Sequence, residues 1–346
     1  MTSLPAFGRL SREMTFMLQA LGAASSVLRR VGRDIARLEK SDRTPVTIAD
    51  LAVQAVLTGL LQRAFPEDVL VAEESGELLR RPEAARLLTE VVAAARDVLP
   101  EADPAQVLAW LDRGAGGTAN RFWTLDPVDG TKGLLRGGQY AAALALIEEG
   151  GVALGGLACP RYPDTATGGS FAVAARGAGA WAASSLDGGW TRLAVSDETE
   201  PARCRLLRSV ESGRATDERL AEVRRALGTT APEVRMDSQV KYLALAGGEG
   251  DLIVRLLRRP GALASMPASA VRENIWDHAS GVLLVEEAGG RCTDVLGRDL
   301  DFWTARQMES NLGVLASNGA LHEAALEALR STAPAGSVER TADGAA

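Results

Sequence analysis

The eight residues DPVDGTKG, at positions 126–133, place two carboxylates three residues apart in a stretch rich in proline and glycine. Because Pro127 keeps Asp126 out of the helical region, we expect a loop here rather than a helix. In such a loop Asp126 and Asp129 can aim at one point, and the carbonyl of Val128 can turn toward the same point. These are the oxygen ligands that suit Mg²⁺, although Asp-Pro and Asp-Gly pairs are also common in ordinary turns.

Further acidic and hydroxyl side chains extend this candidate metal site. Glu73 and Glu74 end an apolar segment, and Asp277, within WDHA, opens a predicted helix. Each of these carboxylates alone could equally be solvated, or be favoured by the dipole at the start of a helix. Beside the aspartates, Gly130 permits a sharp turn and Thr131 places a hydroxyl next to the ion.

The hydrophobic pattern predicts the elements that must position these residues. Apolar residues at helical spacing predict two N-terminal helices, the second with Asp50 near its start, and the Ala- and Gly-rich strands predict a sheet buried on both faces. The helices are expected within 14–31, 47–65, 77–118, 215–228, 238–250, 276–290 and 320–331. The strands are expected within 68–75, 122–125, 139–148, 151–160, 170–184, 205–210, 251–257 and 311–317.

Length and charge restrict the possible classes of protein. A chain of 346 residues is long enough for about two compact units, and we place their division near residue 188, with 332–346 as a disordered tail. The 38 basic and 45 acidic residues give a net charge of −7, which argues against binding nucleic acid or a membrane surface through bulk charge.

The N-terminus and the cysteines indicate the compartment. The first 31 residues contain no uninterrupted apolar run of the kind found in a signal peptide or a membrane span. The three cysteines, Cys159, Cys204 and Cys292, are far apart and lack metal-binding spacing, so we expect buried free thiols. A cytoplasmic protein is therefore expected.

Three blocks of the sequence carry a family resemblance. VAEES, DPVDGTKG and WDHASGVLLVEEAGG resemble, in order, the signature blocks of the Mg²⁺-dependent, lithium-sensitive phosphatases, the superfamily of inositol monophosphatase and fructose-1,6-bisphosphatase. The longer stretch RFWTLDPVDGTKGLLRGGQYAAALALIEEG, with TPVTIADLAVQ and MDSQVKYLALAGGEGDLIVRL, resembles the 3'(2'),5'-bisphosphate nucleotidase branch. The resemblance covers about residues 10–330 and is weakest at 77–118.

The resemblance implies a fold and a metal site. The implied fold combines α+β and α/β lobes in a layered αβαβα sandwich: an N-terminal α+β lobe with most metal ligands (1–188) and a C-terminal α/β lobe with the nucleotide contacts (189–331). Two to three Mg²⁺ ions are implied, with Asp126 bridging two of them and a weaker third ion touching Glu73. The implied ligands are Glu73, Asp126, the Val128 carbonyl, Asp129, Thr131 and Asp277.

The resemblance also implies catalytic and substrate-binding roles. Thr131 and Asp50 would orient the attacking water, with Asp50 accepting the Thr131 proton. Ser238, expected one helical turn before Lys241 on the same face, would contact the nucleotide and its 5'-phosphate. The substrate contacts implied are Thr131, Ser238, Lys241, Arg255 and Asp277.

Two histidines remain outside these roles. His278 directly follows the implied ligand Asp277, and we interpret it as a packing residue rather than a catalytic one. His322, in the last predicted helix, is expected at the surface.

The expected activity is Mg²⁺-dependent removal of the 3'-phosphate of adenosine 3',5'-bisphosphate, and of its sulfated analogue, with inhibition by lithium. Such an activity would clear a by-product of sulfate assimilation. An inositol mono- or polyphosphate phosphatase is the alternative within the superfamily, and a non-catalytic metal- or nucleotide-binding module is a remote one. The expected partner is a small bisphosphonucleotide, without nucleic acid or membrane, bound by a monomer rather than a dimer.

Overall fold

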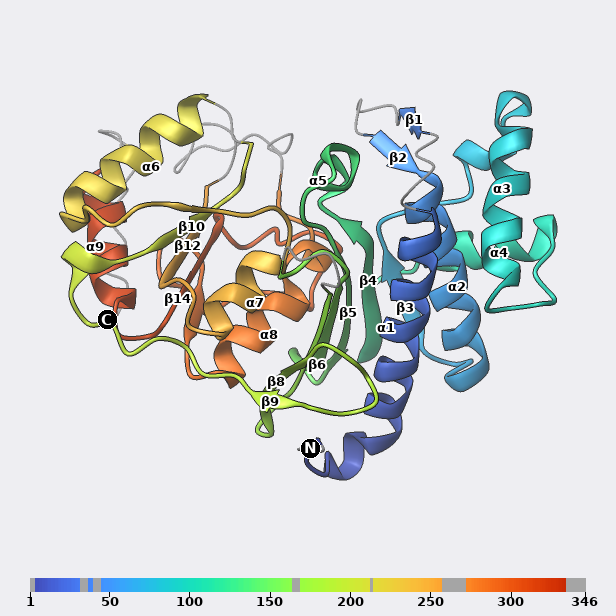
Figure 1. Ribbon diagram of the computed structural model, residues 1–346, viewed down its shortest axis with the longest axis horizontal. Coiled ribbons are helices and arrows are strands. Elements are labelled where there is room, and N and C mark those ends of the chain that lie inside the picture. The colour runs from blue at the N-terminus through green and yellow to red at the C-terminus, as the bar shows by residue number, and fades with distance from the viewer. Residues whose placement is uncertain are drawn as a thin grey trace, which may run out of the picture.

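Helices and sheets alternate in five layers along the longest axis of the molecule (Figure 1). The computed structural model describes residues 4–31, 37–39, 45–163, 169–211, 214–256 and 272–333, so the predicted tail lies almost entirely outside the described residues. The order of layers is helix, sheet, helix, sheet, helix, which confirms the expected αβαβα sandwich. The division into lobes at residue 188 stays a prediction.

The first layer consists of helices packed on one face of the larger sheet. Helices α1, Ser11–Val31, and α2, Ile48–Ala64, bury the apolar residues whose spacing predicted them. Helices α3, Ala85–Arg96, and α4, Pro104–Arg113, pack on the outside of α2, so the predicted helical insertion is largely helical. Short 3-10 turns lie before α1 and α3: η1, Gly8–Leu10, η2, Leu78–Arg80, and η3, Pro82–Ala84.

The larger sheet has seven strands in sequence order, β3 to β9. Strands β3 and β4 are parallel, and the other neighbours are antiparallel. Its two faces belong to different core clusters, which confirms that both faces are buried. The strands are β3, Val69–Ala72; β4, Arg121–Asp129; β5, Ala141–Glu148; β6, Gly151–Cys159; β7, Ser170–Ala175; β8, Gly179–Ala183; and β9, Thr191–Arg192.

The stretch DPVDGTKG is not the loop that we expected. Strand β4 continues through Pro127 to Asp129, and helix α5, Thr131–Arg136, begins after a single glycine. The sheet tolerates the proline because the pairing of β4 with β5 is irregular between Asp126 and Asp129, where a strand N–H is not required. Gly130 adopts φ 87°, a left-handed conformation that lets the chain turn from strand to helix at once.

The remaining layers are built by the second half of the chain. Helices α7, Val240–Ala246, and α8, Ala279–Glu287, lie between the two sheets, and the 3-10 turn η5, Ile275–Asp277, precedes α8. Helices α6, Arg214–Leu227, and α9, His322–Ser331, pack together on the far face of the smaller sheet. The sequence predicts all four helices.

The smaller sheet has five strands in the order β11-β10-β12-β14-β13. The sequence predicts three of them but not β11 and β13, which are too short to show a period of two. Another short antiparallel pair, β1 with β2, precedes α2. The bounds are β1, Arg37–Glu39; β2, Pro45–Thr47; β10, Leu206–Arg208; β11, Val234–Arg235; β12, Leu252–Arg255; β13, Arg291–Thr293; β14, Val314–Ser317; and the 3-10 turn η4, Pro201–Arg203.

His322 is buried, and the prediction of a surface position was wrong. Its side chain is 0% exposed at the start of α9. Nε2 lies 2.9 Å from Thr293 Oγ1, and Nδ1 lies 2.8 Å from Ser317 Oγ. Thr293 donates its own proton to the Asp294 carbonyl, so Nε2 donates to Thr293 and the imidazole is neutral. Burial lowers the pKa of His322 to about 4.

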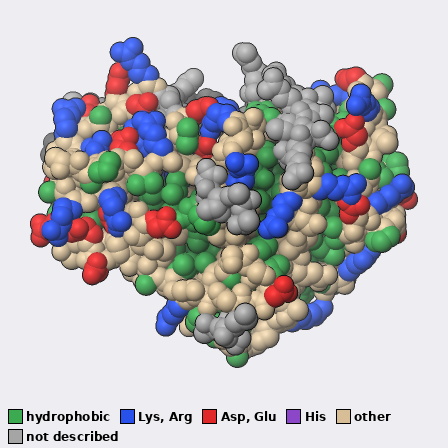
Figure 2. All heavy atoms as spheres, in the orientation of Figure 1, with side chains coloured by type: hydrophobic (Ala, Val, Ile, Leu, Met, Phe, Trp, Pro, Cys, Tyr) green, Lys and Arg blue, Asp and Glu red, His purple; other side chains and the backbone are tan. Residues whose placement is uncertain are grey.

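Charged side chains are mixed on the surface, and the cysteines lie inside. Figure 2 shows acidic and basic side chains of the described residues intermixed on the face drawn, rather than gathered into one basic surface. None of the described helices combines the length and apolar character needed to cross a membrane. All three cysteines are free and buried, as expected.

Candidate active site

Residues from both halves of the chain line one cavity of about 300 Å³. Asp50, Asp126 and Val128, by contrast, are almost completely buried and lie outside the cavity lining. The predicted site residues that line it directly are Glu73, Asp129, Thr131, Ser238, Lys241, Arg255 and Asp277.

Two of the candidate metal ligands lie side by side on neighbouring parallel chains, Glu73 directly after β3 and Asp126 within β4. Ala72 pairs with Leu125, so Glu73 and Asp126 are the next residues along these two chains. The Glu73 N–H donates to the Leu125 carbonyl at 3.2 Å, which keeps the two chains aligned at this point. Because the strands run in the same direction, both carboxylates emerge at the same edge of the sheet.

Helix α2 fixes the end of β3 through a buried glutamine. Gln54 Nε2 donates to the Glu74 carbonyl at 2.6 Å, and the Glu74 N–H donates back to Gln54 Oε1 at 2.8 Å. Gln54 lies one helical turn after Asp50, which is 1% exposed. The two residues therefore set the position of α2 relative to the chain that carries Glu73. Sequence reasoning missed Gln54, because a glutamine in an apolar helix gives no indication of its partner.

Asp50 and Thr131 are in direct contact. Asp50 Oδ2 accepts hydrogen bonds from the N–H and the hydroxyl of Thr47 at 2.7 and 2.5 Å, forming the capping box of α2. Its other oxygen, Oδ1, lies 3.2 Å from Thr131 Oγ1. The Thr131 hydroxyl is also 3.1 Å from the Val128 carbonyl, so its single proton has two acceptors. Asp50 is thus both a helix-capping residue and a partner of Thr131.

Gln239 connects two further candidate ligands and was missed in the sequence. Its backbone N–H donates to Asp129 Oδ2. Its side-chain Nε2 donates to the Trp276 carbonyl at 2.9 Å, next to Asp277, and its Oε1 accepts from the Gly281 N–H at 3.0 Å. Asp129 of the larger sheet is thereby joined to the chain segment that carries Asp277. The block SQVKY contains Gln239, but its neighbouring serine and lysine were the more evident candidates.

The electrostatics of the site favour binding of cations. Burial raises the pKa of Asp126 well above its ordinary value, and the charges of Glu73 and Asp129 raise it further. Asp277 has a similarly raised pKa, from burial first and then from the charge of Asp129. Burial also raises the pKa of Asp129, although Lys241 offsets part of this effect. The carboxylates are therefore close enough to repel one another, and a divalent cation would relieve that repulsion.

Ser238, which also lines the cavity, does not lie in helix α7. It precedes the helix with φ 62°, so the predicted helical turn between Ser238 and Lys241 was wrong. Instead, Lys241 Nζ reaches back and donates to the Ser238 carbonyl at 2.8 Å. Burial lowers the pKa of Lys241 to about 8, although Asp129 acts in the opposite direction.

Arg255 belongs to a chain of polar contacts that ends in the core. Its Nε lies 3.2 Å from Glu273 Oε1, and Glu273 Oε2 lies 3.1 Å from His278 Nε2. Tyr242 Oη is 2.7 Å from His278 Nδ1. Glu273, Asp277 and His278 have potential ligand atoms within 4.8 Å of one another, but Glu273 is already paired with Arg255. The structure thus gives His278 polar anchoring partners, in keeping with the predicted structural role.

Two basic residues of α5 also line the cavity and were not predicted. Arg136 pairs with Glu211 and with Asp237, both from the second half of the chain. Lys132 is exposed at the rim. The signal available in the sequence was their position directly after the aspartates, at the start of LLRGGQY.

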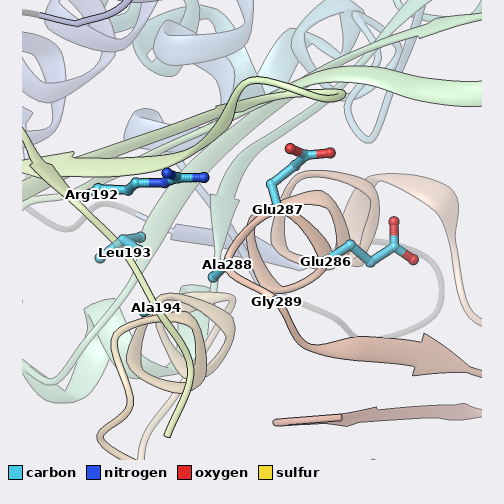
Figure 3. A pocket seen from close by; sticks show the side chains of 7 residues that line it. All are labelled: Arg192, Leu193, Ala194, Glu286, Glu287, Ala288 and Gly289. Carbon is cyan, nitrogen blue, oxygen red and sulfur yellow. The ribbon is translucent and has the colours of Figure 1, made fainter.

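A second hollow lies where α8 meets β9. Its lining does not bring together acids, a hydroxyl and cations as the lining of the first cavity does. Figure 3 shows Glu286 and Glu287 on the helix, with Arg192 on the facing strand. Glu287 accepts hydrogen bonds from the N–H groups of Gly177 and Gly179, at 2.8 and 2.9 Å. Since these acids already stabilise the β7–β8 turn, this hollow is not a candidate catalytic site.

Comparison with known families and proteins finds similarity over most of the chain. The family described as the inositol monophosphatase family matches residues 11–333. A 3'(2'),5'-bisphosphate nucleotidase of Emericella nidulans is 35% identical over 326 residues, covering 85% of this chain and 90% of that protein. Another 3'(2'),5'-bisphosphate nucleotidase, from Schizosaccharomyces pombe, is 35% identical over 311 residues, covering 84% of this chain and 85% of that protein.

Solved structures with the same fold are more distant in sequence. The IMPase of Thermotoga maritima has a TM-score of 0.65 and 20% identity, over 92% of this chain and 97% of that one. An IMPase/NADP phosphatase complexed with Mg²⁺ and phosphate has a TM-score of 0.61 and 17% identity, over 92% and 95%. At these identities the likeness concerns the fold alone.

Proposed function

Since the chain belongs to the inositol monophosphatase family, we propose that it is a Mg²⁺-dependent phosphatase of small bisphosphonucleotides. Relatives named 3'(2'),5'-bisphosphate nucleotidase align with 84% or 85% of the chain, which supports this substrate class over inositol phosphates. The specific reaction proposed is hydrolysis of the 3'-phosphate of adenosine 3',5'-bisphosphate to AMP and phosphate. The analogue 3'-phosphoadenylyl sulfate is expected to react in the same way.

The donor set of the site fits magnesium. Every candidate ligand is an oxygen, which suits a hard divalent cation, and the raised pKa values of the buried aspartates express the repulsion that cations would relieve. When bound, two to three Mg²⁺ ions supply Lewis acidity that favours deprotonation of water and stabilises charge on the leaving oxygen. The proposed ligands are Glu73, Asp126, the Val128 carbonyl, Asp129, Thr131 and Asp277.

Thr131 and Asp50 are proposed to handle the proton of the attacking water. Asp50 is fixed by the two hydrogen bonds from Thr47, so that Oδ1 faces the Thr131 hydroxyl. When Thr131 donates to Asp50, its oxygen is free to accept a hydrogen bond from water. The water passes a proton to Thr131 as Thr131 passes its own to Asp50, and the water oxygen bonds to phosphorus while the bond to the 3'-oxygen breaks. The 3'-oxygen takes up a proton from solvent, and Asp50 afterwards returns one to solvent.

Three further residues of the cavity lining are proposed to hold the nucleotide and its second phosphate. Lys241 and Arg255 both line the cavity and supply positive charge, and Ser238 lies at its wall. Arg255 is oriented by Glu273, whose carboxylate also raises the pKa of the guanidinium. The chain has a net negative charge, which would repel a substrate with two phosphates. Cations at this position would attract the second phosphate.

One observation carries this proposal more than any other. One cavity is lined by three of the acids, by Thr131 and by two cations, although they come from distant parts of the chain: Glu73, Asp129, Asp277, Thr131, Lys241 and Arg255. Asp50 lies outside the lining, in contact with Thr131. A phosphatase whose substrate carries a second phosphate needs acids to hold the metal, a group to activate water and cations to bind the second phosphate.

The decisive experiment measures phosphate release from adenosine 3',5'-bisphosphate, 3'-phosphoadenylyl sulfate and inositol 1-phosphate, with Mg²⁺ and with a chelator. We expect Mg²⁺-dependent turnover, with kcat/KM for the bisphosphonucleotide at least about 10-fold above that for the inositol ester. Asp129→Asn should lower kcat on the order of 100-fold or more by removing a ligand. Asp187→Asn, at an exposed turn outside the cavity, is the matched control and should leave activity unchanged.

Three outcomes would contradict the proposal. A clear preference for inositol 1-phosphate would move the chain to another branch of its family. Equal turnover in the chelator would reject the metal. Retention of most activity by Asp129→Asn would reject the site as described.

A further inference from the structure

Arg306 crosses from the second half of the chain to the end of strand β3. Its Nη2 donates to the Ala72 carbonyl at 2.6 Å, and its Nη1 donates to the carbonyls of Gly114 and Gly116 at 3.0 and 2.9 Å. The same guanidinium lies 5.1 Å from the ring centroid of Trp276. One side chain therefore contacts four backbone or ring groups from three separate segments.

Two of these contacts are adjacent to candidate metal ligands. Ala72 is followed directly by Glu73, and Trp276 is followed directly by Asp277. The two acids belong to different layers of the fold, one at the end of a strand of the larger sheet and the other in the turn before α8. Arg306 therefore contacts the residues that precede both acids.

The segment around Arg306 is itself fixed to the chain that leads to Asp277. The Ile275 N–H donates to the Arg306 carbonyl at 3.1 Å, and the Met308 N–H donates to the Glu273 carbonyl at 2.9 Å. Gln307 forms a β-bridge with Asn274 between these two bonds. The segment that carries Arg306 is therefore fixed to the chain before Asp277, and the guanidinium of Arg306 in turn contacts the end of β3.

The chemistry of these contacts requires an arginine. Arg306 forms no ion pair with any carboxylate of the described residues, so its role is not that of a surface salt bridge. A planar guanidinium can donate to three carbonyls and stack on an indole at the same time, whereas an ammonium is a point donor and cannot stack in this way. The half-buried cation is instead compensated by carbonyl dipoles and by the face of Trp276.

We propose that Arg306 is a positioning residue of the metal site, which fixes the distance between the chain ends that present Glu73 and Asp277. The inference rests on the proposed function only in taking these two acids as ligands. Groups that orient metal ligands, without binding the ion themselves, typically change metal affinity 10- to 100-fold when they are removed. Arg306 contacts the residues that precede the two ligands, so it acts on the ligands through the backbone.

The test measures Mg²⁺ affinity of the full chain by isothermal titration calorimetry, together with urea unfolding in a chelator. For Arg306→Met we expect Mg²⁺ binding about 10-fold weaker than in the wild type. Arg306→Lys keeps the charge but not the planar set of donors, so its affinity should fall between the two. The matched control is Arg113→Met, which removes an arginine that donates to the carbonyls of Pro66 and Asp68, before the opposite end of β3.

The control separates positioning from general stabilisation. Arg113→Met should lower the free energy of unfolding but leave Mg²⁺ affinity within about twofold of the wild type. If Arg306→Met is destabilised in the same way and still binds Mg²⁺ with wild-type affinity, the proposal is overturned. Should Arg306→Met not fold, Arg306→Lys decides: an affinity equal to that of the wild type overturns the proposal, and a weaker one upholds it.

These results also distinguish this inference from the proposed function. If the wild type binds Mg²⁺, and Arg306→Met binds it more weakly, the inference holds even where no phosphate ester is hydrolysed. If the wild type binds no Mg²⁺, the metal site itself is wrong and both proposals fall.

Discussion

Hydrogen bonds fix the orientation of the two side chains that are proposed to act on water, Asp50 and Thr131. Asp50 uses one oxygen to cap helix α2 through Thr47, and its other oxygen lies 3.2 Å from Thr131 Oγ1. The hydroxyl of Thr131 has a second acceptor, the Val128 carbonyl. The direction of the Thr131 O–H bond therefore depends on whether another group binds the Val128 carbonyl. A cation at that carbonyl would favour donation from Thr131 to Asp50.

Substitutions at Thr131 can test this proton path. Thr131→Val keeps the shape and removes the hydroxyl, so kcat should fall by about 100-fold or more if the hydroxyl passes a proton. Thr131→Ser keeps the hydroxyl and should retain kcat within about 10-fold of the wild type. Steady-state kinetics of both variants at saturating Mg²⁺ measure this, and equal losses in the two would argue against a proton-handling role.

A pH dependence of substrate binding follows from the lowered pKa of Lys241. With a pKa of about 8, the ammonium is charged below pH 8 and is lost as the pH rises above it. The KM for a bisphosphonucleotide should therefore rise above pH 8, by up to about 10-fold at pH 9. Lys241→Arg stays charged throughout this range, so its KM should not rise. A wild-type KM that is flat from pH 7 to 9 would show that Lys241 does not bind the anion.

At the scale of elements, the site depends on the abrupt junction between β4 and α5. Asp129 ends the strand and Thr131 begins the helix, so Gly130 alone makes the turn. A Cβ built on Gly130 would lie 2.9 Å from Ser238 Cβ, which is too close for any side chain. The glycine therefore serves two purposes: it adopts a left-handed conformation, and it lets the segment with Ser238 approach the metal-binding turn.

A pair of glycine substitutions at the two ends of α5 separates these purposes. Gly137→Ala, at φ 72° with no neighbour within 4 Å, should cost about 1–2 kcal/mol of stability and leave kcat/KM unchanged. Gly130→Ala carries the same conformational cost and also collides with Ser238, so kcat/KM should fall at least about 10-fold. Chemical unfolding and kinetics of both variants measure this. Full activity of Gly130→Ala would mean that the close approach is not needed.

At the scale of the whole molecule, the site is a meeting point of layers. Glu73, Asp126 and Asp129 come from the larger sheet, Asp50 from the outer helical layer, and Asp277 from the turn before α8. The fold brings these acids together against their mutual repulsion, as the raised pKa values of Asp126 and Asp277 indicate. This repulsion therefore lowers the free energy of unfolding of the sandwich.

This cost predicts how stability responds to metal and to mutation. Mg²⁺ at about 100 times its dissociation constant should raise the free energy of unfolding of the wild type by about 2.7 kcal/mol per site. Asp277→Asn removes one buried charge, so in a chelator it should be at least as stable as the wild type, and most of the Mg²⁺ effect should be lost. Urea unfolding with and without Mg²⁺ measures both; a clearly less stable Asp277→Asn in the chelator would contradict the repulsion.

From the sequence alone, the hydrophobic period predicted the long helices, and the resemblance of three blocks to a known family predicted the layered sandwich and the candidate ligands. Period and spacing are local properties, and VAEES, DPVDGTKG and WDHA each carry their acids within a few residues. The sequence could not locate short strands such as β11 and β13, or the strand-to-helix junction at Gly130, because pairing and close approach involve distant residues.

Only the tertiary structure decided which side chains hold the site in place. Gln54, Gln239 and Arg306 look unremarkable in sequence, yet each contacts a residue directly beside a candidate ligand, or the ligand itself. His322, expected at the surface, proved to be buried between two hydroxyls. The physical reason is the same in each case: a polar side chain is defined by its partner, and these partners lie on other elements, brought near only when the layers pack.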